Sequence, residues 1–275
     1  MYFFCGGPIK SGTTFLQRML NSHPEISCQP EHYLNGLSKE LFNIQTSYNN
    51  KLQYFSEIMG IQPKLVSQET FLNLFFYLLE EIFKNNDHKP ISGINDNDFI
   101  INNSKLLLDQ FTTSRIIYIV RNPFDVALST WDHQFRLYKK EGRPEILKLL
   151  EVDGKLDKNL FVINRFKKLG QLMDKIYQTC QSFKERSIFV RYEDLIENKH
   201  EKLKELFNFL GASSIDSVIN KIVNSSSIED MRISSRNPDF YAKGRINSGI
   251  FDLDRKTYNK ASEIIKRELE LFSYL

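Results

Sequence analysis

The feature that most constrains the fold is a glycine-rich stretch near the start of the chain, GGPIKSGTTFL at residues 6–16. It follows the apolar run YFFC (2–5), and its last residues open an apolar pattern with helical spacing. A strand, a glycine-rich turn and a helix in this order can hold phosphate groups through backbone amides at the helix start. The stretch therefore predicts a βα unit with an anion site above the strand, and a helix capped by Thr13 or Thr14.

The position of the lysine separates this loop from the nucleotide triphosphatase motif. That motif reads GxxxxGK followed by Ser or Thr. Here Gly7 and Gly12 keep the glycine spacing, but the lysine is Lys10, and Thr13 and Thr14 follow the second glycine. The loop is predicted to bind a phosphate-like group without being a Walker A motif.

Further apolar runs predict an α/β fold with a central parallel sheet flanked by helices. IIYIV (116–120) and SIFV (187–190) each lead into a helical pattern, and ISC (26–28) and FII (99–101) are candidates for two more strands. After IIYIV, Asn122 is expected to cap a helix that has Pro123 at its first position.

Apolar stripes predict the remaining helices at about 70–84, 105–111, 160–181, 199–210 and 255–272. Residues 136–159 are polar and weakly patterned, so they are expected to form a mobile excursion over a cleft.

Composition and charge narrow the class of protein. The chain has 275 residues, of which 41% are hydrophobic and 26% charged, which fits a single ordered domain over 1–275. The net charge of +3 comes with no basic run, so nucleic acid is not an expected partner. No apolar stretch reaches the roughly 18 residues of a membrane span, and no signal-peptide pattern precedes the glycines. A cytoplasmic protein without membrane contact is therefore expected, with its three scattered cysteines reduced.

Arginines follow two of the predicted strands. In an open parallel sheet, ligands bind outside the carboxyl ends of the strands, where IIYIV runs into Arg121 and SIFV into Arg191. A triphosphatase is expected to place an aspartate there to hold magnesium. With arginine in that place, Lys10 and Arg121 are expected to neutralise the ligand without a metal.

Ser129 is expected to share the anion with Arg121. It lies seven residues beyond Asn122, two helical turns along, and so returns to nearly the same face. The alternative is a surface arginine beside a serine that bonds its own helix backbone.

Together these motifs resemble those of the sulfotransferases that use 3′-phosphoadenosine 5′-phosphosulfate (PAPS). PIKSGTTFL resembles that family's 5′-phosphosulfate loop, IVRNPFDVALS its 3′-phosphate motif, and VRYEDL the segment with an adenine-contacting tyrosine. NSSSIEDM and AKGRINSG are similar to the family's TSFxxM and RKGxxGDW stretches, although Ala242 replaces the arginine and GDW is absent. The resemblance covers residues 4–249 and implies a P-loop-type sulfotransferase fold. It also implies PAPS as donor and adenosine 3′,5′-bisphosphate (PAP) as product.

The resemblance carries the family's donor site onto three sets of residues. The 5′-phosphosulfate would be cradled by Lys10, Ser11, Gly12, Thr13 and Thr14. The 3′-phosphate would be held by Arg121, Ser129, Lys243 and Gly244, with Arg245 as a substitute for the missing arginine. Ser226 and Ser227 match the TS pair of the TSFxxM stretch and would also bind the nucleotide. Phe15 and Tyr192 would contact the adenine.

Sulfuryl transfer explains the place of the lysine. Negative charge develops on the oxygen between the sulfur and the departing phosphate, and a cation held there stabilises the transition state. Lys10 is the candidate for this role.

The acceptor hydroxyl must lose its proton, so a base is expected nearby. Glu31, in CQPE, resembles the glutamate base of family members that act on carbohydrates or tyrosyl peptides. The histidine base of the small-molecule cytosolic members has no counterpart in GINDNDFI, which leaves Asp96 as a second candidate. His32 and His133 are expected as site neighbours.

The acceptor stays open among a carbohydrate, a lipid-like alcohol, a phenol and a polyketide hydroxyl, and the oligomeric state is not readable from the sequence. Two other functions compete. A P-loop nucleotide kinase or triphosphatase would bind ATP with magnesium, and a non-catalytic protein of the same fold would bind the nucleotide without turnover.

Overall fold

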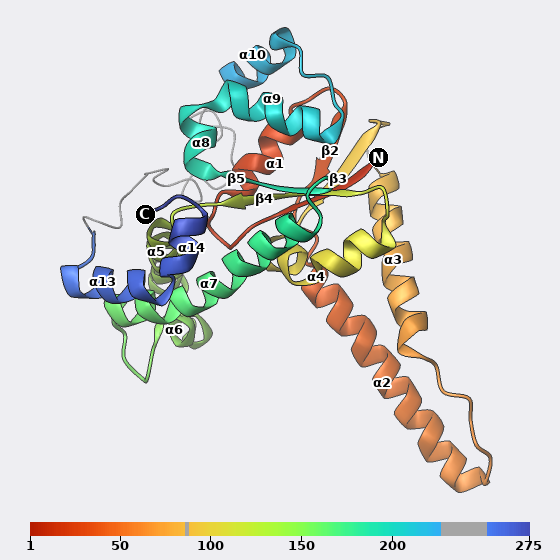
Figure 1. The fold of residues 1–275 in the computed structure, drawn as a ribbon. Coiled ribbons are helices and arrows are strands. Elements are labelled where there is room, and N and C mark those ends of the chain that lie inside the picture. Colours follow the sequence, from red (N-terminus) through yellow and green to blue (C-terminus); the bar gives the residue numbers. More distant parts are fainter. Residues whose placement is uncertain (86–87, 227–251) are drawn as a thin grey trace.

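A parallel sheet lies at the centre of the molecule (Figure 1). The computed structural model of the protein describes residues 1–85, 88–226 and 252–275. The strands are β1 (Tyr2–Gly6), β2 (Ile26–Gln29), β3 (Ile91–Asn95), β4 (Arg115–Val120) and β5 (Ser187–Arg191), in the order β2-β3-β1-β4-β5. All four neighbouring pairs are parallel. The carboxyl ends of the strands therefore meet at one edge, where ligands of such sheets bind.

Helices cover both faces of this sheet (Figure 1). One face carries α1 (Thr13–Asn21), α8 (Tyr192–Glu197), α9 (Lys199–Leu210) and α10 (Asp216–Ser225). The other carries α3 (Gln68–Lys84), α4 (Asn97–Gln110), α7 (Lys158–Ser182) and α14 (Lys266–Leu271). Beside α7 lie α5 (Pro123–Glu141), α6 (Pro144–Leu150) and α13 (Arg255–Ile264). This is the α/β arrangement that the sequence predicts.

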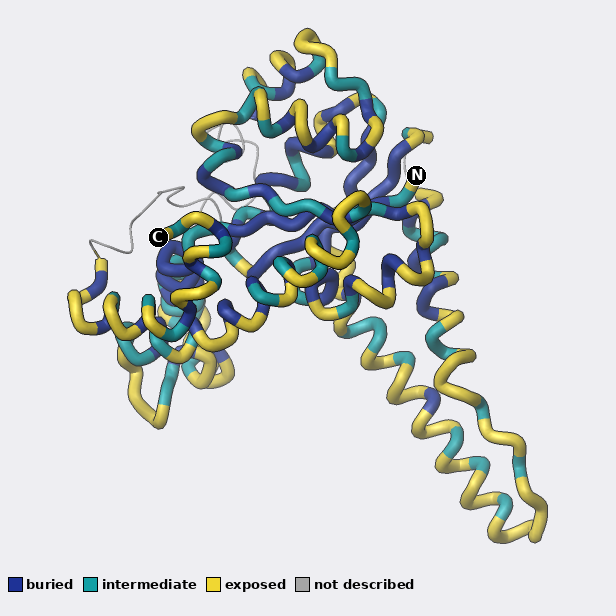
Figure 2. Tube along the Cα trace, in the orientation of Figure 1, coloured by how far each residue is buried: buried dark blue, intermediate teal, exposed yellow. Residues whose placement is uncertain are grey.

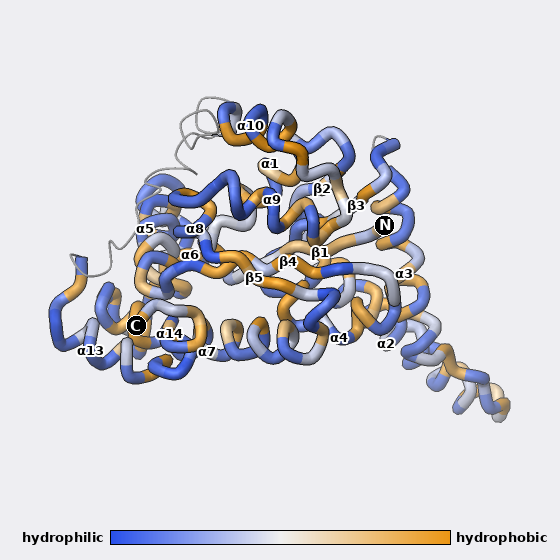
Figure 3. The backbone as a smooth tube through the Cα atoms, turned by 45° about the horizontal axis from the view of Figure 1, so that its top comes forward, coloured by the Kyte–Doolittle hydropathy of each residue, from blue (hydrophilic) through white to orange (hydrophobic). Residues whose placement is uncertain are grey.

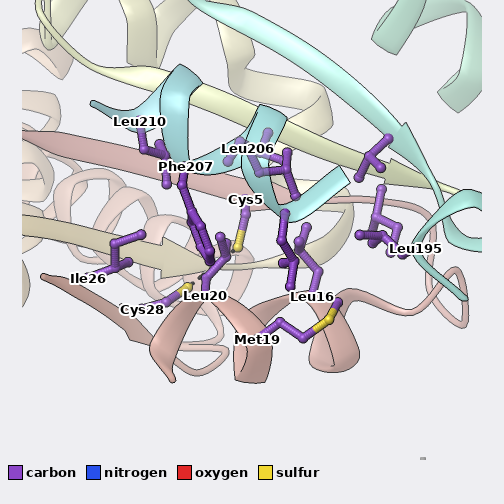
Figure 4. Close-up of a cluster of buried hydrophobic side chains, with 14 of the residues drawn as sticks. Cys5, Leu16, Met19, Leu20, Ile26, Cys28, Leu195, Leu206, Phe207 and Leu210 are labelled. Carbon is purple, nitrogen blue, oxygen red and sulfur yellow. Dashed lines mark hydrogen bonds between the residues drawn. The ribbon is translucent and has the colours of Figure 1, made fainter. Parts of the chain in front are cut away.

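The period of two along β1 divides the core between the two faces. Phe3 and Cys5 are buried in the cluster under α1 and α9, whereas Phe4 is buried in the cluster under α3 and α4. Figure 4 shows Cys5 and Cys28 in the first cluster, with 3.6 Å between their Sγ atoms. The three cysteines carry free thiols, as expected. Figure 3 shows the hydrophobic strands lying between the helical layers.

One expected strand is wrong. Residues 99–101 (FII) belong to α4, and all three are buried against the sheet as part of that helix. The strand is instead β3, whose sequence ISGIN contains a glycine. A Cβ at Gly93 would lie 2.2 Å from the ring of Phe3 on β1, so the glycine makes room for that ring.

The expected excursion at 136–159 is also wrong for much of its length. Helix α5 continues to Glu141 and ends at Gly142, whose φ of 64° suits a helix C-terminus, and α6 follows directly. The helix expected at 255–272 is divided into α13 and α14 at Ile265. The expected helices at 70–84, 160–181 and 199–210 agree with α3, α7 and α9 within two residues.

The longest helix, α2 (Leu34–Met59), was not expected from the sequence. Together with the segment 60–67 and α3 it forms an arm that projects from the body (Figure 1). Figure 2 shows the outer part of this arm as mostly exposed. No helix in the described ranges is long and apolar enough to cross a membrane.

Candidate active site

The glycine-rich loop turns tightly between β1 and α1. Gly12 is the N-cap of α1 and has φ of 102°, a backbone conformation that residues other than glycine rarely adopt. A Cβ there would also lie 2.6 Å from Cδ2 of Tyr192. The expected cap by Thr13 or Thr14 is therefore wrong, because Gly12 occupies the cap position and both threonines lie in the first turn. Their backbone amides belong to the helix start, which has no intrahelical acceptors.

Two side chains of the loop hold it to the sheet and to α4. The hydroxyl of Ser11 donates to the carbonyl of Ile119 on β4 at 3.1 Å, and the amide of Ser11 donates to Pro8 at 2.9 Å. Both hydrogen-bond donors of Ser11 are therefore used to hold the loop in place. Thr13 Oγ1 donates to Asn97 Oδ1 at 2.8 Å.

Lys10 lies in a crowded, positively charged environment. Its backbone has φ of 74°, which is unusual for a residue other than glycine. Burial, and then the charge of Arg136, lower the pKa of Lys10 to about 8. Burial, and then the charges of Lys10 and Arg136, lower the pKa of His133 to about 4. The charge of Lys10 therefore acts on the expected neighbour His133, and with this lowered pKa His133 is neutral at pH 7.

Arg121 follows β4, and β4 neighbours β1. Its Nη1 donates to the carbonyl of Lys10 at 3.4 Å, and its Nη2 lies 3.8 Å from Oδ2 of the buried Asp125. The guanidinium carbon lies 4.6 Å from the centre of the Tyr192 ring, in cation–π geometry. The structure thus brings together the loop lysine and the strand-end arginine.

The helix after Arg121 begins as the sequence predicts. Asn122 Oδ1 accepts from the amide of Phe124, and Pro123 occupies the first turn. The amide of Asn122 donates to Glu193 of α8 at 2.9 Å, which ties α5 to the segment that carries Tyr192. Ser129 is half-buried on α5, four residues before His133 and so on the same helix face.

The aromatic pair expected to contact adenine is buried. Phe15 and Tyr192 are in edge contact with 5.7 Å between ring centres. Lys199 on α9 lies with Nζ 5.9 Å from the centre of the Phe15 ring and donates to the carbonyl of Ser226 at 3.0 Å. Ser226 is 2% exposed, and within the described ranges its Oγ has no hydrogen-bond partner. Ser227, Lys243, Gly244 and Arg245 lie outside the described residues.

A chain of hydrogen bonds joins the expected base to the loop. Glu31 is exposed, and its Oε2 accepts from Asn97 Nδ2 at 3.0 Å, while Asn97 Oδ1 accepts from Thr13. Asn97 begins α4 directly beyond β3. Glu31 is therefore two hydrogen bonds away from the first turn of α1. Its neighbour His32 is also exposed, with its pKa lowered by partial burial.

Asp96 lies directly after β3, the strand that the sequence analysis did not place. It is 3% exposed and accepts from the amide of Leu34 at 2.9 Å. Burial, and then the charges of Glu31 and Asp98, raise the pKa of Asp96 to about 6 against the effect of that hydrogen bond. In the described ranges, no three or more His, Cys, Asp or Glu side chains are grouped to hold a metal ion.

Sequence reasoning missed three residues of this region: Asn97, Arg136 and Lys199. Asn97 would follow from placing the strand at 91–95, since residues just beyond a parallel strand face the ligand edge. Arg136 lies seven residues after Ser129, two helical turns along α5, but it falls in the stretch that was expected to be irregular. We see no signal in the sequence that would have singled out Lys199.

The fold and this site define an α/β protein with a strand, glycine-rich loop and helix of the P-loop type. The family model for the sulfotransferase domain matches residues 3–273, and the chain belongs to this family. The resemblance of its motifs to those of sulfotransferases is thereby confirmed.

Individual relatives are distant. The protein-tyrosine sulfotransferase A of Caenorhabditis elegans is 20% identical over 223 residues, which cover 79% of this chain and 52% of the relative. The chain thus spans about half the length of that relative. The crystal structure of mouse sulfotransferase SULT7A1 complexed with PAP is 19% identical with a TM-score of 0.60, covering 97% of this chain and 83% of that one. A sulfotransferase from Alicyclobacillus acidocaldarius has a TM-score of 0.56 at 14% identity, covering 98% and 92%. These structures share the fold.

Proposed function

We propose that the protein transfers the sulfuryl group of PAPS to the hydroxyl group of an acceptor. One observation carries the proposal: Arg121, directly after β4, donates to the backbone carbonyl of Lys10 in the loop that follows the adjacent β1, beside the N-termini of α1 and α5. Two cations next to two helix starts form a strong site for a ligand with several negative charges.

The residues present fit the donor. Ser226 has a buried hydroxyl without a partner in the described ranges, which a phosphate oxygen would satisfy. The lowered pKa of Lys10 reflects a cation that burial and Arg136 destabilise, and an anion bound beside it would relieve both effects. PAPS, when bound, supplies the sulfur whose bond to the bridging phosphate oxygen breaks as the bond to the acceptor oxygen forms.

Each residue has a separate part in this proposal. Lys10 holds its ammonium where charge develops on the leaving phosphate, and the amides of Thr13 and Thr14 stabilise the same group. Arg121 and Ser129 bind the second phosphate. The ring of Tyr192 packs against the guanidinium of Arg121 and holds it in place. A contact between Tyr192 and adenine stays a prediction.

Glu31 is the proposed base, which accepts the proton of the acceptor hydroxyl. Asn97 supports this role, because it donates to one carboxylate oxygen of Glu31 and fixes that oxygen relative to the loop. Asp96 is the second candidate, but its carboxylate already accepts from the backbone of α2. His133 is neutral beside Lys10 and adds no further positive charge to the site.

The class of acceptor is open, and two observations guide the first screen. The exposed position of Glu31 suits a large acceptor that approaches from solvent. The nematode relative is named a protein-tyrosine sulfotransferase, which makes a phenolic hydroxyl, free or in a tyrosyl peptide, the first to test.

Calorimetric titration of PAP in the presence of EDTA tests the donor site. We expect wild-type protein to bind PAP, and Arg121→Ala to weaken binding at least about tenfold, since a charge-assisted hydrogen bond contributes ~1.5–3 kcal/mol. Arg191→Ala is the matched control. Arg191 is the last residue of β5 and lies over a tyrosine ring, that of Tyr274, but it donates to the carbonyl of Ser273 instead of the loop.

Two results would contradict the proposed donor site. One is equal weakening by Arg121→Ala and Arg191→Ala. The other is no binding of PAP together with tight binding of ATP and magnesium, which would favour the kinase or triphosphatase alternative.

Transfer from PAPS to the acceptor panel tests the base. Glu31→Gln should lower the rate by ~10²–10⁴-fold and leave PAP binding unchanged. Product formation at the wild-type rate by this variant would exclude Glu31 as the base, and Asp96→Asn would then be measured in the same assay. Tight PAP binding without transfer to any acceptor would favour the non-catalytic alternative.

A further inference from the structure

The arm made by α2, the segment 60–67 and α3 leaves many of its apolar side chains exposed. Of the 26 residues in α2, only Leu34 and Gln45 are buried. Asn49 bonds through its side chain to the amide and carbonyl of Val66, at 3.0 and 2.8 Å. The segment before α3 therefore reaches Asn49, and α3 lies along only the inner half of α2. The outer half of α2 is accompanied by an extended segment and not by a second helix.

An apolar stripe continues along this outer half. Leu37 and Leu41 pack against the core at the base of the arm. The same alternating spacing of three and four residues continues through Ile44, Tyr48, Lys51, Phe55 and Ile58. Ile44 is 56% exposed, Tyr48 49%, Phe55 56% and Ile58 63%. We call these five residues the α2 stripe. Their spacing is the heptad pattern of a helix that packs against another helix.

We propose that the α2 stripe pairs antiparallel with the α2 stripe of a second copy of this chain, which makes the protein a dimer through its arms. A two-fold axis near position 53 places Tyr48 opposite Ile58 and Lys51 opposite Phe55 of the other copy. Each such pair of positions sums to 106, as a two-fold axis requires. This proposal does not depend on the proposed activity.

Charge excludes a register in which the two lysines meet. A single lysine within a heptad seam selects the alignments that accommodate its charge. An axis at position 51 would bring the two copies of Lys51 together. The axis at 53 instead sets each ammonium against the ring of Phe55 in the other copy, where a cation–π contact stabilises it.

Size and shape also suit a second helix. With the axis at 53, residues 47–59 of the two copies of α2 lie side by side over about 20 Å, while the two bodies lie at opposite ends. Covering the four half-exposed stripe residues that lie in this overlap buries on the order of 450 Å² per partner, which is the range of weak, reversible association.

A membrane surface is a poorer fit for the same stripe. Interfacial helices carry many Lys and Arg on the polar face. The outer arm from residue 41 to 67 has only Lys51, Glu57 and Lys64 as charged residues, so it lacks a basic face.

Analytical ultracentrifugation of the full chain tests the proposal. We expect wild-type protein at about 50 μM to sediment as a dimer, and Phe55→Glu to weaken association at least about 30-fold, because it places a charge in the seam. Phe42→Glu is the matched control, since Phe42 is 50% exposed on the opposite side of the same helix. This control should remain a dimer.

A cross-link tests the register. With Tyr48→Cys and Ile58→Cys in one chain, the two new thiols lie ten residues apart on one helix and are too distant to bond to each other. Mild oxidation should therefore give a covalent dimer, whereas Phe42→Cys should not. A monomeric wild type at 50 μM, or equal loss of the dimer with Phe42→Glu, would overturn the proposal. So would a monomer that floats with vesicles of phosphatidylcholine and phosphatidylglycerol.

Discussion

Replacing Asp96 by asparagine should make the protein more stable at neutral pH, although it removes a carboxylate from the candidate site. The carboxyl group of Asp96 is buried, and its pKa is raised from 3.8 to about 6. A raised pKa means that the folded state favours the protonated form. The stabilising effect of that form is present below about pH 4, and it is lost as the pH rises through 6. Because the pKa of Asp96 is higher by about 2 in the folded protein than in the unfolded chain, the loss between pH 4 and 7 is ~3 kcal/mol.

The comparison with Asp96→Asn isolates this loss from all other titrating groups. Asparagine keeps an oxygen that accepts from the amide of Leu34 and carries no charge at any pH. Urea unfolding of both proteins between pH 3.5 and 7.5 gives the difference in their free energies of unfolding. We expect the difference to be pH-independent below pH 4 and to rise by ~3 kcal/mol in favour of the variant by pH 7.5. A flat difference, or a variant that becomes less stable as the pH rises, would refute a raised pKa at Asp96.

Three further outcomes follow from the loop and its supports. Lys10→Ala should lower the transfer rate by ~10²–10³-fold. In the wild type, calorimetry should show that PAP affinity falls above pH 8 as Lys10 loses its proton, whereas the affinity of Lys10→Ala should not fall there. Gly12→Ala should lower the free energy of unfolding by ~2–4 kcal/mol in urea titrations, because φ is 102° and the added Cβ would lie 2.6 Å from Tyr192; wild-type stability would contradict this geometry. Asn97→Ala should lower kcat about tenfold with the PAP dissociation constant unchanged, since Glu31 would lose the donor that fixes it; unchanged kcat would argue against Glu31 as the base.

The parts of the fold that the sequence predicts well are those governed by local rules. The run IIYIV followed by Asn122 and Pro123 is a strand and a capped helix because burial and capping both act within a few residues. The helical spacing from Ser129 to His133 likewise predicts their shared face. The apolar runs indicate the two strands that Lys10 and Arg121 follow, but the adjacency of these strands comes from the structure.

The parts that the sequence did not reveal depend on contacts between distant segments. β3 was missed because Gly93 is a poor strand residue by itself, and its role is to admit the ring of Phe3 from another strand. With that strand misplaced, neither the strand-end position of Asp96 nor the bridging position of Asn97 could be predicted. α2 was missed because further apolar residues, such as Phe42 and Tyr54, lie outside its stripe and blur a single amphipathic pattern.

The left-handed backbone at Lys10 has a consequence for engineering. Its φ of 74° would suit glycine or asparagine better, and relief of such strain adds about 1 kcal/mol or more to stability. A selection for thermal resistance would therefore tend to replace this lysine and discard the cation with it. Position 10 is thus one where libraries screened only for stability and libraries screened only for activity should diverge, and any programme to make the protein more robust should leave it fixed.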